Sequence, residues 1–409
     1  MRRVVTAFVL AASMLVPAVA APAQTVETAE IETVPGGIKQ TLTNYSRAFS
    51  SYDEDLLRKS VTEQMLPSEL AALRNIEDLT FDEFTIATST QYSGDLAVKR
   101  IRSLYPGREV ATYHVIERTK IAGESNTFEE DGIYTFTRER DSDEWRLASK
   151  KDLDVLGAFS PVHLWDGGPV AKLVSTHFTL LTHPESLDEM RPVIDIAERA
   201  YAKVDEFWPR PMARNFVIIA PSTTEELGNI LHETVDIENF VAFVVAGVNR
   251  ERGWSPTGPR VMVHLSHLRR YGADAQLEIL AHELVHAVTR PIAGPKIPLF
   301  VEEGLANVGG GEGGRPPSSF RGPAPDDFPT DEGFSIGPVA QIQNVYDRSQ
   351  LAVQALVDAL GVESATRFYE TLGRKRVVPG VDEYHVRVAI DEATDWSYEE
   401  WLEAWRAKL

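Results

Sequence analysis

The chain has 409 residues, 43% of them hydrophobic, and its 61 acidic and 41 basic residues give a formal net charge of -20. This length exceeds the usual size of a single core, so we expect two domains. The negative charge argues against nucleic-acid or anionic-lipid partners, because no broad basic face is available. The chain has no cysteine, so any metal site must use histidine and carboxylate ligands.

The first 23 residues have the layout of a secretory signal peptide. Arg2 and Arg3 precede a largely apolar run from Val4 to Val16, and small residues that fit an A-x-A cleavage site follow. The alternative is a membrane anchor, but the apolar run is shorter than the roughly 20 residues that a membrane span requires. We therefore predict export to the periplasm or the extracellular medium, with no membrane span after cleavage.

Residues 24–37 are polar and contain a Pro-Gly-Gly breaker, which predicts a linker. From Ile38 the apolar spacing predicts two helices before Asp78. Alternating strand-like segments then start at Phe81, Glu109, Asp131 and Glu144. Turn-like connections between them favour an antiparallel meander, so residues 38–157 are predicted to form a small α+β domain. In length and element order this domain resembles the nuclear-transport-factor-2-like (cystatin-like) fold.

Residues 158–409 alternate strands with helices, which indicates a second domain of different architecture. The strands are expected at residues 177–183, 215–220, 241–248 and 260–265. A long helix is expected between the first two strands, and a helix capped by Ser222 or Thr223 after the second. The whole chain is thus predicted to be an α+β protein.

Residues 281–290 read AHELVHAVTR, on a largely apolar helix that Pro291 would stop. His282 and His286 are four apart, so they share one helix face and can occupy two corners of a tetrahedral zinc site. Glu283 points about 100° away and can reach a metal-bound water. The alternative interpretation is an ordinary helix that carries two polar histidines.

A third ligand is available in PLFVEEGLAN, residues 298–307, where a second apolar segment carries paired carboxylates. Periodicity does not choose between Glu302 and Glu303, since either could face inward. Another possible histidine pair, His264 and His267, is expected on a strand. A spacing of three would place these two side chains on opposite faces of that strand.

HELVH followed by FVEEGLA resembles the gluzincin zinc metallopeptidases, in particular the peptidase MA-like families with HExxH and a downstream E-G-x-A. The resemblance implies a zincin-like fold for residues 158–409 and one Zn²⁺ per chain. It also implies Glu303 as the third ligand, with Glu302 as its neighbour. A tyrosine that donates to the oxyanion would correspond to Tyr346, for which a packing role is the alternative. The G-x-M-E-N substrate motif of aminopeptidases is absent from the sequence.

These features predict a secreted, zinc-dependent metalloprotease, a hydrolase acting on peptide or protein substrates. Attack by a zinc-bound water would be assisted by Glu283 as general base. The glycine-rich stretch Gly309 to Pro338 follows the third-ligand helix and is expected to form a lid or binding loop. The alternative is a non-catalytic secreted binding protein that retains a metallopeptidase fold. The intact Glu283 argues against it, since a closed structural site needs no general base.

Overall fold

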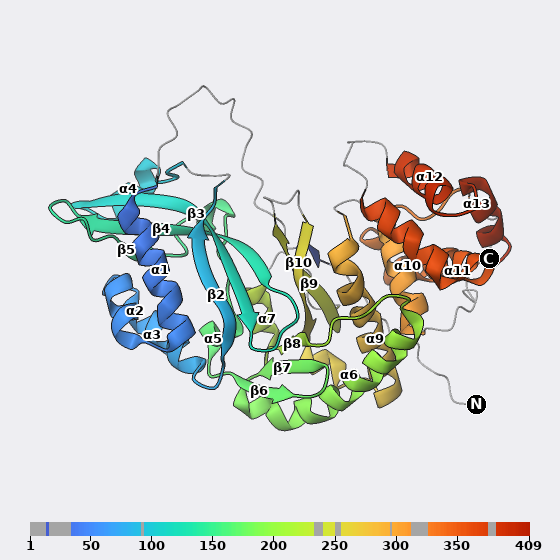
Figure 1. Ribbon diagram of the computed structural model, residues 1–409, viewed down its shortest axis with the longest axis horizontal. Helices are drawn as coiled ribbons and strands as arrows, with labels where there is room; N and C mark the ends of the chain where they lie inside the picture. Colours follow the sequence, from blue (N-terminus) through green and yellow to red (C-terminus); the bar gives the residue numbers. More distant parts are fainter. Residues whose placement is uncertain are drawn as a thin grey trace.

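The computed structural model (Figure 1) describes residues 14–15, 34–90, 94–232, 240–249, 255–294, 297–311, 326–374 and 382–409. It is a mixed α+β protein with two sheets, as the sequence predicted. The proposed signal peptide lies outside these residues apart from β1 (Met14–Leu15). Within the described residues, no helix combines the length and apolar character needed to cross a bilayer.

Three helices, rather than the two predicted, precede the first long strand. They are α1 (Gly36–Ser51), α2 (Glu54–Ser60) and α3 (Leu66–Asn75), so the predicted linker is two residues too long at its end. Helices α1 and α2 are separate because Tyr52 adopts a left-handed backbone conformation (φ 56°) that ends α1. The side chain of Asp53 then accepts a hydrogen bond from the Leu56 amide and caps α2.

The predicted antiparallel meander is confirmed as a four-stranded sheet in the order β2-β3-β4-β5. Its elements are β2 (Phe81–Thr88), α4 (Lys99–Leu104), β3 (Arg108–Ile121), β4 (Phe128–Glu139) and β5 (Arg146–Ser149). Apolar side chains of α1 to α3, among them Leu42 and Leu73, pack in one core with sheet residues such as Phe136.

The six-stranded sheet has the order β1-β9-β10-β8-β7-β6. Strands β7, β8 and β10 are mutually parallel. Strand β6 runs antiparallel to β7, and β9 runs antiparallel to β10 but parallel to β1. The elements from the end of the first sheet are η1 (Asp154–Leu156), α5 (Leu164–Gly167), β6 (Ala171–Val174), β7 (Phe178–Thr182), η2 (Pro184–Ser186), α6 (Leu187–Phe207), β8 (Phe216–Ala220), α7 (Thr224–Ile230), β9 (Ala242–Asn249) and β10 (Ser255–Val263). Thr223 caps α7, in line with the sequence prediction.

Both faces of the six-stranded sheet are covered. Leu180 and Ile218 contribute to the core that contains α6 and the histidine-bearing helix α9 (Ala273–Thr289). Their neighbours Leu181 and Val217 belong instead to the core of the N-terminal part. Because strand side chains alternate between faces, strands buried on both sides become continuous apolar runs.

The two sheets pack closely against each other. Arg260 on β10 donates hydrogen bonds from Nε and Nη2 to the two carboxylate oxygens of Glu124, each at 2.9 Å, and both side chains are 3% exposed. At Gly247 on β9, a Cβ atom would lie 1.7 Å from the backbone oxygen of Glu129 on β4. This approach is possible only without a side chain at residue 247. The predicted boundary near residue 158 stays a prediction.

The remaining helices gather at the end of the molecule opposite the four-stranded sheet (Figure 1). They are α8 (Leu265–Leu268), α9, η4 (Arg290–Ile292), α10 (Leu299–Gly310), η5 (Asp331–Phe334), α11 (Val339–Gly373), α12 (Asp382–Ala393) and α13 (Tyr398–Arg406). Gly309 and Gly310 are helical, so the expectation that the loop starts at Gly309 is wrong. Helix α10 ends at Gly310, and Gly311 caps it with a left-handed backbone (φ 76°). Residues 312–325 of the predicted lid lie outside the described residues.

We expect Gly247→Ala to lower the free energy of unfolding by about 2–3 kcal/mol, because the added methyl group must push β9 away from β4. Gly36→Ala is the matched control, since nothing lies within 4 Å of a Cβ there. Urea denaturation of the two variants and the parent measures the difference. Equal midpoints for Gly247→Ala and the parent would contradict the close packing.

Candidate metal centre

Helix α9 is buried along most of its length and places two histidines inside the core. Ile279, Leu284 and Val285 pack in the core that α9 shares with α6 and the six-stranded sheet. His282 and His286 are 1% and 0% exposed. The helix ends at Thr289, two residues before Pro291. A proline at that position cannot donate the next helical hydrogen bond.

Glycines allow α10 to approach its neighbours closely. A Cβ on Gly304 would lie 2.4 Å from the backbone oxygen of Ser349 on α11. A Cβ on Gly310 would lie 3.1 Å from the Cα of His282 on α9. Gly304, which follows Glu303, is therefore needed for packing: it lets α10 lie against α11 while Glu303 faces α9.

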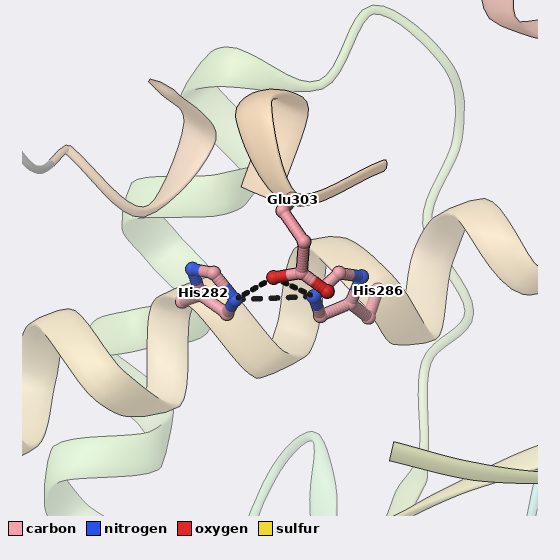
Figure 2. A group of neighbouring side chains, drawn as sticks. All are labelled: His282, His286 and Glu303. Atoms are coloured by element: carbon pink, nitrogen blue, oxygen red, sulfur yellow. Dashed lines mark hydrogen bonds and ion pairs between the residues drawn. The ribbon is translucent and has the colours of Figure 1, made fainter. Parts of the chain in front are cut away.

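Three donor atoms meet between α9 and α10 (Figure 2). Oε2 of Glu303 lies 3.3 Å from Nε2 of His282 and 3.6 Å from Nε2 of His286. The two histidine Nε2 atoms are 3.1 Å apart. Ligands about 2.0–2.1 Å from a tetrahedral zinc lie roughly 3.3–3.4 Å from one another. This buried group can therefore hold a metal ion.

The structure brings Glu303, and not Glu302, to the histidines. Glu302 points to a different partner, Arg290, whose Nη2 donates to Oε1 of Glu302. Both members of this ion pair are buried. The sequence did not predict a role for Arg290; its only signal was one basic residue directly after the largely apolar second half of α9.

Two of the candidate ligands, His286 and Glu303, are in their deprotonated forms at neutral pH. Burial disfavours the charged imidazolium and lowers the pKa of His286 to about 4, although Glu303 acts in the opposite direction. Burial alone would raise the pKa of Glu303, but the nearby side chains of His286 and His282 lower it instead. A cation thus meets a neutral imidazole and an ionised carboxylate.

Glu283 is fully buried beside the cluster without being part of it. Among the described residues, no group donates a hydrogen bond to either of its carboxylate oxygens. Burial raises the pKa of Glu283 to about 8, and the charge of Glu303 adds to that rise while His282 and Arg290 oppose it. Such a group is ready to exchange a proton near neutral pH.

Tyr346 lies on α11 within electrostatic reach of the cluster. Burial raises its pKa well above the ordinary value, and the charges of Glu303 and Glu283 raise it further. Its ring meets Phe334 edge-on at 4.9 Å between centroids. These contacts are compatible with both a packing role and a donor role.

The expected separation of His264 and His267 is wrong. Strand β10 ends at Val263, and His264 is the N-cap of the short helix α8. The two rings stack with centroids 3.8 Å apart. His264 bonds to Thr224 and Ser266, and His267 to the backbone of Phe240, so both rings have structural partners.

Comparisons of the chain with protein-family models, with curated proteins and with solved structures found no significant match.

We expect Glu303→Gln to weaken zinc binding by at least 100-fold, because an amide replaces the anionic ligand between two histidines. Glu283→Gln is the matched control, since the same change one residue from His282 leaves all three donors in place. Competition with a chromophoric chelator measures both affinities. Equal loss in the two variants would show that the cluster is not the ligand set.

In the metal-free protein, the stability advantage of Glu283→Gln over the parent should grow as pH rises. The folded-state pKa of Glu283, about 8, exceeds the ordinary value of 4.5. The protonated form therefore favours folding, and the parent loses this contribution as pH rises from about 4.5 through about 8. Thermal unfolding of both proteins at pH 5, 6.5 and 8 in a chelating buffer tests the trend; a constant gap would contradict it.

Proposed function

We propose that the protein is an exported zinc metallopeptidase of the gluzincin type. The observation that carries the proposal is the buried group of His282, His286 and Glu303 with the carboxylate of Glu283 beside it. A structural zinc site is satisfied by its ligands and does not require an additional buried carboxylate without hydrogen-bond donors. A hydrolytic site does require one.

His282, His286 and Glu303 would hold the zinc ion, which when bound supplies a Lewis acid that acidifies water and polarises the scissile carbonyl. Glu283 takes the proton of the attacking water onto its carboxylate. The positive charge of a bound cation lowers the pKa of Glu283 from about 8 in the metal-free protein, which makes it a base near neutral pH. Glu283 then passes the proton to the leaving amine.

Tyr346 is proposed to donate its hydroxyl proton in a hydrogen bond to the oxygen of the carbonyl under attack. Its high pKa keeps the hydroxyl protonated throughout the working pH range. Electrostatic contact with both Glu283 and Glu303 supports this placement. A donor at this position stabilises negative charge that develops only in the transition state.

The substrate backbone is proposed to pair with β9, the strand next to the outer edge of the six-stranded sheet and in contact with α9. In the full chain, Val245 and Ala246 pair with Met14 and Leu15 of β1. Removal of the proposed signal peptide would leave this part of β9 without that partner. An extended peptide could then take the place of β1.

The zincin-like fold of residues 158–409 and the nuclear-transport-factor-2-like fold of residues 38–157 belong to the same proposal. The α+β arrangement and the helix pair α9 and α10 support the first, and three helices against a four-stranded meander support the second. Residues 1–23 would direct export to the periplasm or the extracellular medium and would then be cleaved off.

The decisive experiment incubates the zinc-loaded protein, without residues 1–23, with a library of unstructured peptides and identifies products by mass spectrometry. We expect Glu283→Gln to lose at least a thousandfold in kcat/KM while retaining zinc, because the base is lost and the ligands are not. We expect Tyr346→Phe to lower kcat about 10- to 100-fold with little change in KM.

Zinc content and thermal unfolding of each variant provide the controls. If the zinc-loaded parent cleaves no peptide in the library, the result favours the alternative function, a non-catalytic binding protein. An unchanged kcat in Tyr346→Phe would leave the peptidase proposal intact and assign Tyr346 to packing.

A further inference from the structure

A cavity of about 1010 Å³ lies where α3 and the end of β5 meet α5 and α7, and none of its lining residues belongs to the metal centre. Its walls come from the start of α3, the end of β5, the connector at residues 159–167, the end of β7 and helix α7. Leu181 and Val217 face this side of the six-stranded sheet, whereas α9 packs on the other side. Small-molecule sites usually measure about 300–1,000 Å³, so the cavity is large enough for an organic ligand.

Two lining cations, Lys150 and His163, are bound to buried carboxylates behind or within the wall. Nζ of Lys150 donates to Oε2 of Glu69 at 3.1 Å and to the hydroxyl of Tyr45 at 2.7 Å. Nε2 of His163 lies 2.7 Å from Oε1 of Glu117. The charges of Lys150 and His163 are therefore offset, and Lys151, which is exposed, is the other lysine of the lining.

Carboxylates outnumber basic groups in the rest of the lining. Glu226 is paired with His183, and the lining acids without such an ion pair are Asp154, Asp166, Glu185 and Glu225. Asp166 and Glu225 are exposed to solvent. They come from elements in contact: a Cβ on Gly167, next to Asp166, would lie 2.5 Å from Oε1 of Glu226 on α7. Helices α5 and α7, which carry Asp166 and Glu225, therefore meet at one side of the cavity.

The same cavity has an aromatic wall. The rings of Phe159 and His232 stack with centroids 4.8 Å apart and planes 8° from parallel. Burial lowers the pKa of His232, so this ring is neutral at pH 7. Met65, Val162 and Ile230 add aliphatic surface to the lining. Neutral aromatic and aliphatic surface beside carboxylates suits a cation that also has an apolar part.

We propose that this cavity binds an organic cation, an amine or guanidine whose charged group lies near Asp166 and Glu225 and whose apolar part contacts Phe159 and His232. The charge could come from a free amine or from a lysine or arginine side chain of a peptide. The site is independent of the metal centre, because none of its lining residues is a member of the histidine and glutamate cluster.

Isothermal titration of the full chain with spermidine, with acetyl-Gly-Arg-Gly-amide and with citrate tests the proposal. All titrations use the Glu283→Gln background, so that peptide cleavage does not contribute heat. At least one cationic probe should bind with an affinity that falls as NaCl rises, and citrate should bind more weakly. Binding of spermidine alone indicates a free amine as ligand, and binding of the peptide indicates a basic side chain.

The paired change Asp166→Asn with Glu225→Gln should weaken binding of the cationic probe roughly three- to tenfold, since two nearby charges are removed. Asp205→Asn with Glu206→Gln makes the same charge change on exposed residues of α6 and should leave the affinity unchanged. Thermal unfolding verifies that both variants fold. The proposal is overturned if neither cation binds at millimolar concentration, if citrate binds more tightly, or if the two double variants behave alike.

Discussion

The burial of charge is the constraint on which the C-terminal part of the structure depends. His282, Glu283, His286, Arg290, Glu302 and Glu303 are all buried within two adjacent helices and the turn after α9. Each isolated buried ion costs several kcal/mol, so the core tolerates them only where charges or hydrogen bonds offset that cost. Arg290 offsets Glu302 directly, and the two histidines partly offset Glu303. Glu283 is left as a carboxyl whose pKa rises until it is protonated at neutral pH.

The backbone geometry that permits this arrangement is set by small residues. Gly304 and Gly310 remove the side chains that would otherwise hold α10 away from α11 and α9. Only then does Glu303 reach both Nε2 atoms from a separate helix. The chemistry of the candidate centre therefore depends on two glycines that carry no functional group. A larger residue at either position would shift Glu303 relative to the histidines, although all three ligands would still be present.

Much of this fold follows from local pattern. Alternation predicted the meander and the strands β7 to β10, and helical spacing predicted α9 with its two histidines. The choice between Glu302 and Glu303 did not follow from periodicity, because both positions are buried and differ only in their tertiary partners. His264 was misassigned because its strand-like sequence continues past Val263, where the chain turns into α8. The split after α1 depended on a left-handed tyrosine, which no propensity favours.

The six-stranded sheet separates two regions of different chemistry. On one face, α9 and α10 bring together a buried group of ligands; on the other, segments between residues 64 and 232 line a wide acidic cavity. No short motif could indicate that cavity, because its residues meet only when the two sheets pack together. The bonds from Arg260 to Glu124 and the contact of Gly247 with β4 fix that packing. Any change that loosens this interface should therefore alter the cavity before it reaches the metal ligands, which are held by helix contacts on the opposite side of the sheet.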